Sequence, residues 1–238
     1  MATDLRLSFF LVVMLLAGFP VPSVAAGASD QGSALAAAGW EEYTPGRWIS
    51  RADRKVEIRA DGFSAEIALS PGTGVAWEKK GIWDPEKGAV LSLELSSSGT
   101  NARSDDYRRF DARFPVSVTA VFGNDRQSLP WKTRVAGFFR KIRHGFAPGG
   151  ICLTYAFGNR APVGSMYRLA DEETVFILAG EEEKGKKVRS DRNLREDFLA
   201  AYGRPPTGPV TGFVVRADRS SGERGPLSAG VAIALPGP

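Results

Sequence analysis

The stretch VLSLELS, residues 90–96, alternates leucine with serine or glutamate. Leu91, Leu93 and Leu95 fall on one face of an extended chain, and the residues between them fall on the other face. Successive side chains of a β-strand point to opposite faces, so this alternation predicts a strand with one buried and one solvated face.

Seven further segments read as strands and are separated by turn-forming glycine, proline and aspartate. They are KVEIRA (55–60), FSAEIAL (63–69), FPVSVTAVF (114–122), ICLTYAF (151–157), ETVFILA (173–179), VTGFVVRA (210–217) and LSAGVAIAL (227–235). The last four are nearly continuous in apolar residues, which is typical of central strands covered on both faces. Helical patterns do not separate most of these segments, so we predict a mostly β fold, an antiparallel β-sandwich or jelly roll.

Two segments have helical periodicity and are expected to dock on the sandwich as short helices, at about 131–145 and 191–202. The basic side chains of the first helix are Lys132, Arg134, Arg140, Lys141 and Arg143. This helix could lie on an anionic membrane as a peripheral contact, but a docked amphipathic surface helix is favoured. The second helix is predicted to begin after a cap at Ser190 or Asp191 and to end at Gly203.

The N-terminus has the form of a signal peptide, with an apolar run at 7–19 followed by small residues. Cleavage is predicted after Ala26, with Ala25 as the alternative, and an uncleaved anchor is the other interpretation. We expect residues 1–26 to be this signal peptide, 27–39 a flexible linker and 40–238 a single β-sandwich domain. A periplasmic or secreted protein with no transmembrane span in the mature chain is therefore predicted.

Composition excludes several classes of chemistry. The formal net charge is +4, a mildly basic balance that suits anionic surfaces, and no nucleic-acid motif is present. A single cysteine, Cys152, cannot form an internal disulfide. A single histidine, His144, is a poor basis for a catalytic triad, and one His with one Cys cannot build a usual zinc site. We expect no cofactor, with calcium as the one ion to test.

Carboxylates are the remaining candidates for chemistry. Asp105 and Asp106 cluster in a loop, and Glu172 and Glu173 begin a strand. A glycosidase needs two carboxylates facing each other in a cleft, and calcium prefers several carboxylate oxygens. A solvated turn with local ion pairs is the favoured interpretation of the aspartate cluster.

Tryptophans could supply a glycan-binding surface. Trp77 and Trp83 flank a charged stretch, and sugars stack on exposed aromatic rings. If these rings fill the core instead, they cannot bind a ligand. Exposure of the two side chains therefore decides between these interpretations.

The C-terminal part is similar to a known family. The runs ICLTYAFGNRAPVGSMY (151–167) and TVFILAGEEEKGKKVRSDRNLREDFLAAYGRPPTGPVTGFVVRAD (174–218) resemble a bacterial exported family known only as domain of unknown function 3047 (DUF 3047). The resemblance covers roughly residues 88–235. It implies no assigned activity, but it adds Arg192, Asn193 and Asp218 as ligand-binding candidates and Asp218 as a metal candidate.

In that family the strand ending at Asp218 is followed by an Asp- and Asn-rich loop. Here Ser220 and Ser221 stand where the second aspartate and the asparagine are expected, which removes much of any ligand set.

Three functions remain open. A non-catalytic binding module for a glycan or cell-envelope polymer is favoured. A structural or protein-interaction role in the envelope is the second hypothesis, and a carboxylate-based hydrolase is the third. An exposed Trp surface would favour the first, an exposed apolar patch the second, and two facing carboxylates in a cleft the third.

Overall fold

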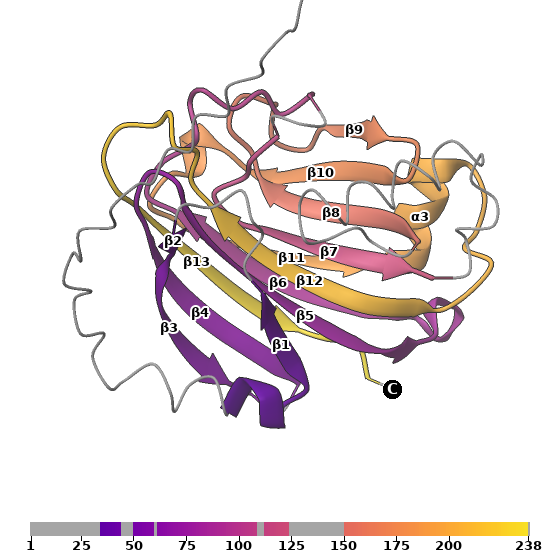
Figure 1. Ribbon diagram of the computed structural model, residues 1–238. Coiled ribbons are helices and arrows are strands. Elements are labelled where there is room, and N and C mark those ends of the chain that lie inside the picture. The colour runs from indigo at the N-terminus through magenta and orange to yellow at the C-terminus, as the bar shows by residue number, and fades with distance from the viewer. Residues whose placement is uncertain (1–33, 44–49, 60, 109–111, 124–149, 238) are drawn as a thin grey trace, which may run out of the picture.

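The structure is a computed structural model that describes residues 34–43, 50–59, 61–108, 112–123 and 150–237. Two β-sheets pack face to face, and one α-helix lies at one end of them (Figure 1). The predicted mostly β sandwich is confirmed. The predicted signal peptide and the predicted basic helix at 131–145 lie outside the described residues.

The large sheet has the strand order β1-β5-β12-β7-β8-β10-β9, with β2 paired to β5. Its strands are β1 (Trp40–Tyr43), β2 (Ser50–Arg51), β5 (Thr73–Trp83), β7 (Ser117–Phe122), β8 (Ile151–Phe157), β9 (Met166–Ala170), β10 (Glu173–Ala179) and β12 (Val210–Asp218). Its strand pairs are antiparallel except β8 with β10 and β2 with β5, which are parallel.

The small sheet has the order β11-β6-β13-β4-β3 and is antiparallel throughout. Its strands are β3 (Asp53–Ile58), β4 (Gly62–Leu69), β6 (Val90–Ser97), β11 (Lys187–Asn193) and β13 (Leu227–Ala234). Two short 3-10 helices, η1 (Pro85–Lys87) and η3 (Glu181–Glu183), lie in the connections. The C-terminal strand β13 thus lies between two strands from the first half of the chain.

The hydrophobic core fills the space between the sheets. Leu91, Leu93 and Leu95 of β6 are buried in it, as their alternation predicts. Phe63 of the small sheet meets Trp77 of the large sheet with ring centroids 5.3 Å apart. Edge-to-face ring contacts of this kind add to the free energy gained from burying apolar area.

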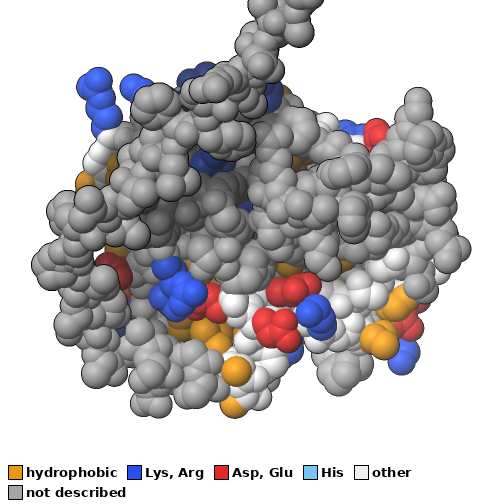
Figure 2. Space-filling model, viewed as in Figure 1, with side chains coloured by type: hydrophobic (Ala, Val, Ile, Leu, Met, Phe, Trp, Pro, Cys, Tyr) orange, Lys and Arg blue, Asp and Glu red, His pale blue; other side chains and the backbone are white. Residues whose placement is uncertain are grey.

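The large sheet is also buried on its other face in places. All seven residues of β8 are buried, which confirms the central strand predicted from its continuous apolar run. A second apolar cluster on that face includes Phe114, Val175 and Ile177. In the view of Figure 2, the described surface shows acidic and basic side chains beside one another. Lys80 of β5 lies 3.3 Å from Glu41 of the neighbouring strand β1.

The helix α3 (Leu194–Tyr202) begins later than expected. Residues 191–193 continue β11, because Asn193 still pairs with Val90 of β6. The predicted caps at Ser190 and Asp191 are therefore wrong, since the Asn193 side chain accepts hydrogen bonds from the first-turn amides of Arg195 and Glu196. Gly203 ends the helix in the left-handed conformation at φ 69°, as expected.

Part of the segment expected to be a flexible linker is packed. Leu35 is 2% exposed within the core cluster, and Lys79 donates a hydrogen bond to the carbonyl oxygen of Ala38 at 3.0 Å. Residues 34–39 therefore belong to the folded domain, because a buried leucine fixes the chain around it. No helix within the described ranges is both long enough and apolar enough to cross a membrane.

Candidate active site

The outer face of the small sheet is hollow along its central strand. The outward side chains of β13 are no larger than serine: Ser228, Gly230, Ala232 and Ala234. The inward side chains of the same strand, such as Val231 and Ile233, are buried in the core. Since longer side chains stand on the neighbouring strands, the small residues form the floor of a groove.

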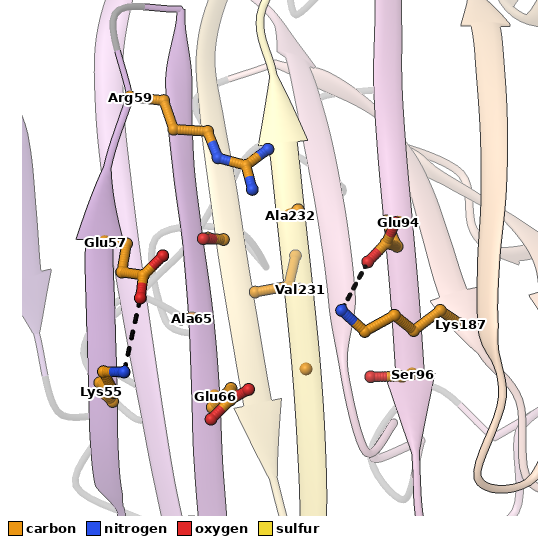
Figure 3. A pocket seen from close by; sticks show the side chains of 12 residues that line it. Lys55, Glu57, Arg59, Ala65, Glu66, Glu94, Ser96, Lys187, Val231 and Ala232 are labelled. Carbon is orange, nitrogen blue, oxygen red and sulfur yellow. Dashed lines mark ion pairs between the residues drawn. The ribbon is translucent and has the colours of Figure 1, made fainter.

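Two hollows together form this groove. One measures about 180 Å³ and the other about 500 Å³, and both are lined by Lys55, Glu66, Ser96 and Gly230. Figure 3 shows the first hollow, with charged side chains from β3 and β4 on one side and from β6 and β11 on the other. The groove therefore crosses the whole five-stranded sheet.

Two glutamates from different strands reach this groove. Glu94 of β6 lies opposite Ala232, and Glu66 of β4 lies opposite Gly230. Their strands are separated only by β13, and the residues between them lack long side chains. With strands about 4.8 Å apart and a stagger of two residues, the two Cα atoms are about 12 Å apart.

The two carboxylates have unlike surroundings. Glu94 accepts a hydrogen bond from Arg189 Nε at 2.6 Å and lies 3.1 Å from Lys187 Nζ. The hydrogen bond from Arg189 lowers the pKa of Glu94. Partial burial works in the opposite direction, and Lys187 lowers the pKa further. Glu66 has no ion pair or hydrogen bond within the described part of the chain, although it lies opposite Lys55. Glu94 is therefore held as an anion by two cations, whereas the Glu66 side chain has no such partner among the described residues.

The groove offers a narrow range of chemistry. No histidine or cysteine lines either hollow, and the described residues contain no group of three or more His, Cys, Asp or Glu that could hold a metal ion. Nucleophilic triads and zinc-type hydrolysis need such residues. The lining of the first hollow does include Glu66 and Glu94, and a pair of carboxylates can carry out acid–base chemistry.

The tryptophan candidates lie elsewhere. Trp77 is fully buried and donates a hydrogen bond from Nε1 to Glu42 at 3.2 Å. Trp83 is 7% exposed and packs on Phe213 with ring centroids 4.8 Å apart. Both rings fill the core, so the prediction that Trp77 and Trp83 form a glycan-stacking surface is wrong.

Arg192 and Asn193 hold the helix in place. The Arg192 guanidinium binds both carboxylate oxygens of Asp197, which also accepts a hydrogen bond from Tyr155 at 2.8 Å. Burial alone would lower the pKa of Arg192, but the bonds to Asp197 raise it overall. Asn193 caps the helix, as described above. These contacts explain why the chain keeps a helix here: it is fixed to β8 through Tyr155.

Each of the aspartate candidates has partners within the protein. Asp106 is buried and accepts hydrogen bonds from the amides of Asn159, Arg160 and Ala161 and from the Asn159 side chain, at 2.6–2.9 Å. Asp105 is partly exposed and pairs with Arg108. The buried Asp218 pairs with Arg216. The donors around Asp106 occupy both of its oxygens, so Asp106 ties two loops together.

The other carboxylate pair considered from the sequence does not meet. Glu173 pairs in register with Cys152 at the start of β8, whereas Asp106 binds residues that follow the end of β8. The length of that strand, about 20 Å, separates them. Glutamates 66 and 94 were not singled out from the sequence. Each lies at an outward position of an alternating strand, but only the pairing of β4 and β6 with β13 brings them to one groove.

A comparison with known protein families identifies the family of this chain. The family described as "Protein of unknown function (DUF3047)" matches residues 68–224. The chain belongs to the DUF3047 family. This confirms the resemblance seen in the C-terminal part, and no curated protein matches the chain.

Among solved structures, this DUF3047 chain is similar to several glycoside hydrolases. The catalytic domain of Humicola grisea Cel12A matches at 11% identity and a TM-score of 0.45, over 83% of this chain and 93% of that chain. The Rhodothermus marinus endoglucanase Cel12A matches at 9% identity with a TM-score of 0.43. The match covers 84% of this chain and 93% of that chain. The Bacillus licheniformis family 12 xyloglucanase matches at 7% identity with a TM-score of 0.40. The match covers 83% of this chain and 93% of that chain. At these values the likeness assigns no role to any residue.

The expectation of a non-catalytic glycan-binding module is wrong, because the tryptophans on which it depended, Trp77 and Trp83, are buried in the core. The DUF3047 chain does present two carboxylates facing one groove, which is the arrangement expected of a carboxylate-based hydrolase.

Proposed function

We propose that this DUF3047 protein is a carboxylate-based hydrolase that cleaves a polysaccharide lying in the groove of the small sheet. The observation that carries the proposal is the pair Glu66 and Glu94, which face one hollow from either side of a floor without long side chains. Hydrolysis of a glycosidic bond needs only two carboxylates, one acting as acid and one as base or nucleophile.

The unlike surroundings of the two glutamates assign their roles. Glu94, held as an anion by Arg189 and Lys187, accepts a proton from the attacking water. Glu66 donates a proton to the glycosidic oxygen while the bond from that oxygen to the anomeric carbon breaks and the water oxygen bonds to that carbon. The products are a new reducing end and a free hydroxyl group. Glu94 ends protonated and Glu66 ionised, and exchange with solvent restores both.

The separation of the glutamates predicts the stereochemistry. Carboxyl groups about 6.5 to 9.5 Å apart leave room for a water molecule and invert the anomeric centre, whereas retaining enzymes place them about 5 to 5.5 Å apart. Glutamate side chains whose Cα atoms are about 12 Å apart can approach the wider spacing. We therefore expect inversion, measured by proton NMR of the first product before mutarotation.

The test of activity is release of reducing ends. The mature chain would be incubated with a panel of neutral and acidic polysaccharides, and reducing ends would be counted over time. The proposal expects release from at least one polymer, lost on heat denaturation. A folded, pure protein that releases nothing from the whole panel would overturn the proposal and leave the protein-interaction hypothesis.

We also propose that the protein acts in the periplasm or outside the cell, after cleavage near Ala26. The apolar run followed by small residues in the first 26 positions supports this. The mass of the protein recovered from the periplasm or medium tests it. A mass that begins at Gly27 is expected, and a full-length cytoplasmic product would contradict the proposal.

A further inference from the structure

One arginine of the groove is exposed and reaches over the floor. Arg59, just after β3, extends across β4 toward Ala232 of β13 (Figure 3). Within the described residues no ion pair involves its guanidinium, although Glu57 and Glu66 line the same hollow. A guanidinium is a planar fork of donors that matches a carboxylate or a sulfate in two parallel hydrogen bonds.

The opposite wall also presents positive charge. The side chains of Lys187 and Arg189 are 71% and 84% exposed, whereas that of Glu94, which they bind, is only 17% exposed. A molecule approaching this wall therefore meets the two cations first and the carboxylate beneath them. Lys55, 69% exposed, is a second cation beside Arg59 on the β3 side and is paired there with Glu57.

We infer that the substrate is an acidic polysaccharide, whose carboxylate or sulfate groups bind Arg59 at one wall and the Lys187 and Arg189 pair at the other. This inference rests on the proposed function, because it names the substrate of the same groove. The walls on β3 and β11 are about 19 Å apart across five strands, so one chain of several sugar residues contacts both. The formal net charge of +4 favours its approach.

The experiment separates binding from cleavage. Binding of oligogalacturonate, a sulfated dextran oligomer and a neutral xyloglucan oligomer would be measured by calorimetry on the mature E66Q chain, which the proposed mechanism makes inactive. We expect one of the acidic ligands to bind, the neutral one to bind far more weakly, and affinity to fall as salt is raised. The acidic ligand that binds more tightly shows whether the groove prefers a carboxylate or a sulfate.

The variant R59Q, built on E66Q, tests the arginine. We expect affinity for the acidic ligand to fall about tenfold, since a charge-assisted contact is lost. R108Q is the matched control, because Arg108 is an exposed arginine in the loop of Asp105, away from the groove. Unchanged binding by R59Q, or equal losses in R59Q and R108Q, would overturn the inference.

The outcome distinguishes this inference from the proposed function. If the acidic ligand binds but the wild-type chain never cleaves it, the hydrolase proposal fails and the ligand class stands. If the wild-type chain cleaves neutral polymers as well as acidic ones, the hydrolase stands and this inference fails.

Discussion

Two neighbouring residues show how surroundings decide the role of a carboxylate. Asp106 is fully buried and accepts hydrogen bonds from three backbone amides and one side-chain amide. Asp105, one residue earlier, is partly exposed and contacts Arg108 and the amide of Tyr107. The donors around Asp106 form charge-assisted hydrogen bonds with it, and the two loops that it joins depend on those bonds.

This difference predicts unequal costs for the same substitution. Asp106→Asn should lower the free energy of unfolding by about 3 kcal/mol, because it removes charge-assisted bonds and places an amide donor against other donors. Asp105→Asn, the matched control, should cost less than about 1 kcal/mol. Urea unfolding measures both. Equal losses, or a calcium-dependent rise in wild-type stability that Asp105→Asn removes, would contradict this account.

Glu94 gives a prediction of pH dependence. Its pKa is lowered in the folded chain, first by the hydrogen bond from Arg189. A lowered folded pKa adds stability above the unfolded pKa, and this stability is lost as pH falls through the folded pKa. Between about pH 7 and about pH 3, Glu94→Gln should therefore lose less stability than the wild type.

Denaturant unfolding across that range checks the prediction. Glu182→Gln, at an exposed site on η3, is the control and should follow the wild type. A Glu94→Gln curve parallel to that of the wild type would mean that Arg189 and Lys187 do not hold this carboxylate.

At the scale of elements, the strand β13 makes the groove. Its inward residues pack in the core, and its outward residues are too small to fill the space between β4 and β6. An added Cβ at Gly230 would lie 2.5 Å from Ser96 Oγ, so the floor tolerates little growth at that position. Ala232, which lies between Glu94 and Ser64 in register, is the position where a larger side chain would block the hollow.

Filling the groove should lower activity without unfolding the protein. Ala232→Phe is expected to lower kcat/KM at least tenfold, about 1.4 kcal/mol, because it occupies the space between the two glutamates. Ala234→Phe is the control, since Ala234 lies on the same face but lines neither hollow. Steady-state kinetics and thermal unfolding measure both variants. An active Ala232→Phe enzyme would place the reaction elsewhere.

The sequence predicts elements better than it predicts their partners. Alternation located β4 and β6, and continuous apolar runs located β8, β10, β12 and β13. The prediction that β13 is covered on both faces is wrong, because its outward residues are exposed or only partly buried. The strand β5 was read only as a tryptophan-bearing surface, because its buried Trp77 and Trp83 flank a charged stretch. The strand β11 was taken partly into the helix because its charged residues have no apolar period.

The site could not be predicted for a related reason. Glu66 and Glu94 are ordinary outward residues of two strands, and nothing local in the sequence shows that β13, about 130 residues after β6, would lie between them. The aspartate loop was a candidate site because Asp105 and Asp106 are adjacent in the sequence. Strand order across a sheet, which creates the groove, is a long-range property.

At the scale of the whole molecule, the two sheets carry different features on their outer faces. The large sheet carries the second apolar cluster and the helix fixed by Tyr155, Asp197 and Arg192. The small sheet has a solvated outer face with charged walls and a floor of small residues. The core between the sheets keeps the strands of the small sheet in register, and that register sets the distance between the two glutamates.

The most direct measurement is kcat/KM of the glutamate variants on a polysaccharide that the mature chain cleaves. We predict that Glu66→Gln and Glu94→Gln each lose about a hundredfold or more, because each removes one proton-transfer step. Glu57→Gln, on the same wall but paired with Lys55 and 65% exposed, should keep nearly full activity. If both groove variants stay fully active while remaining folded, this groove is not the active site.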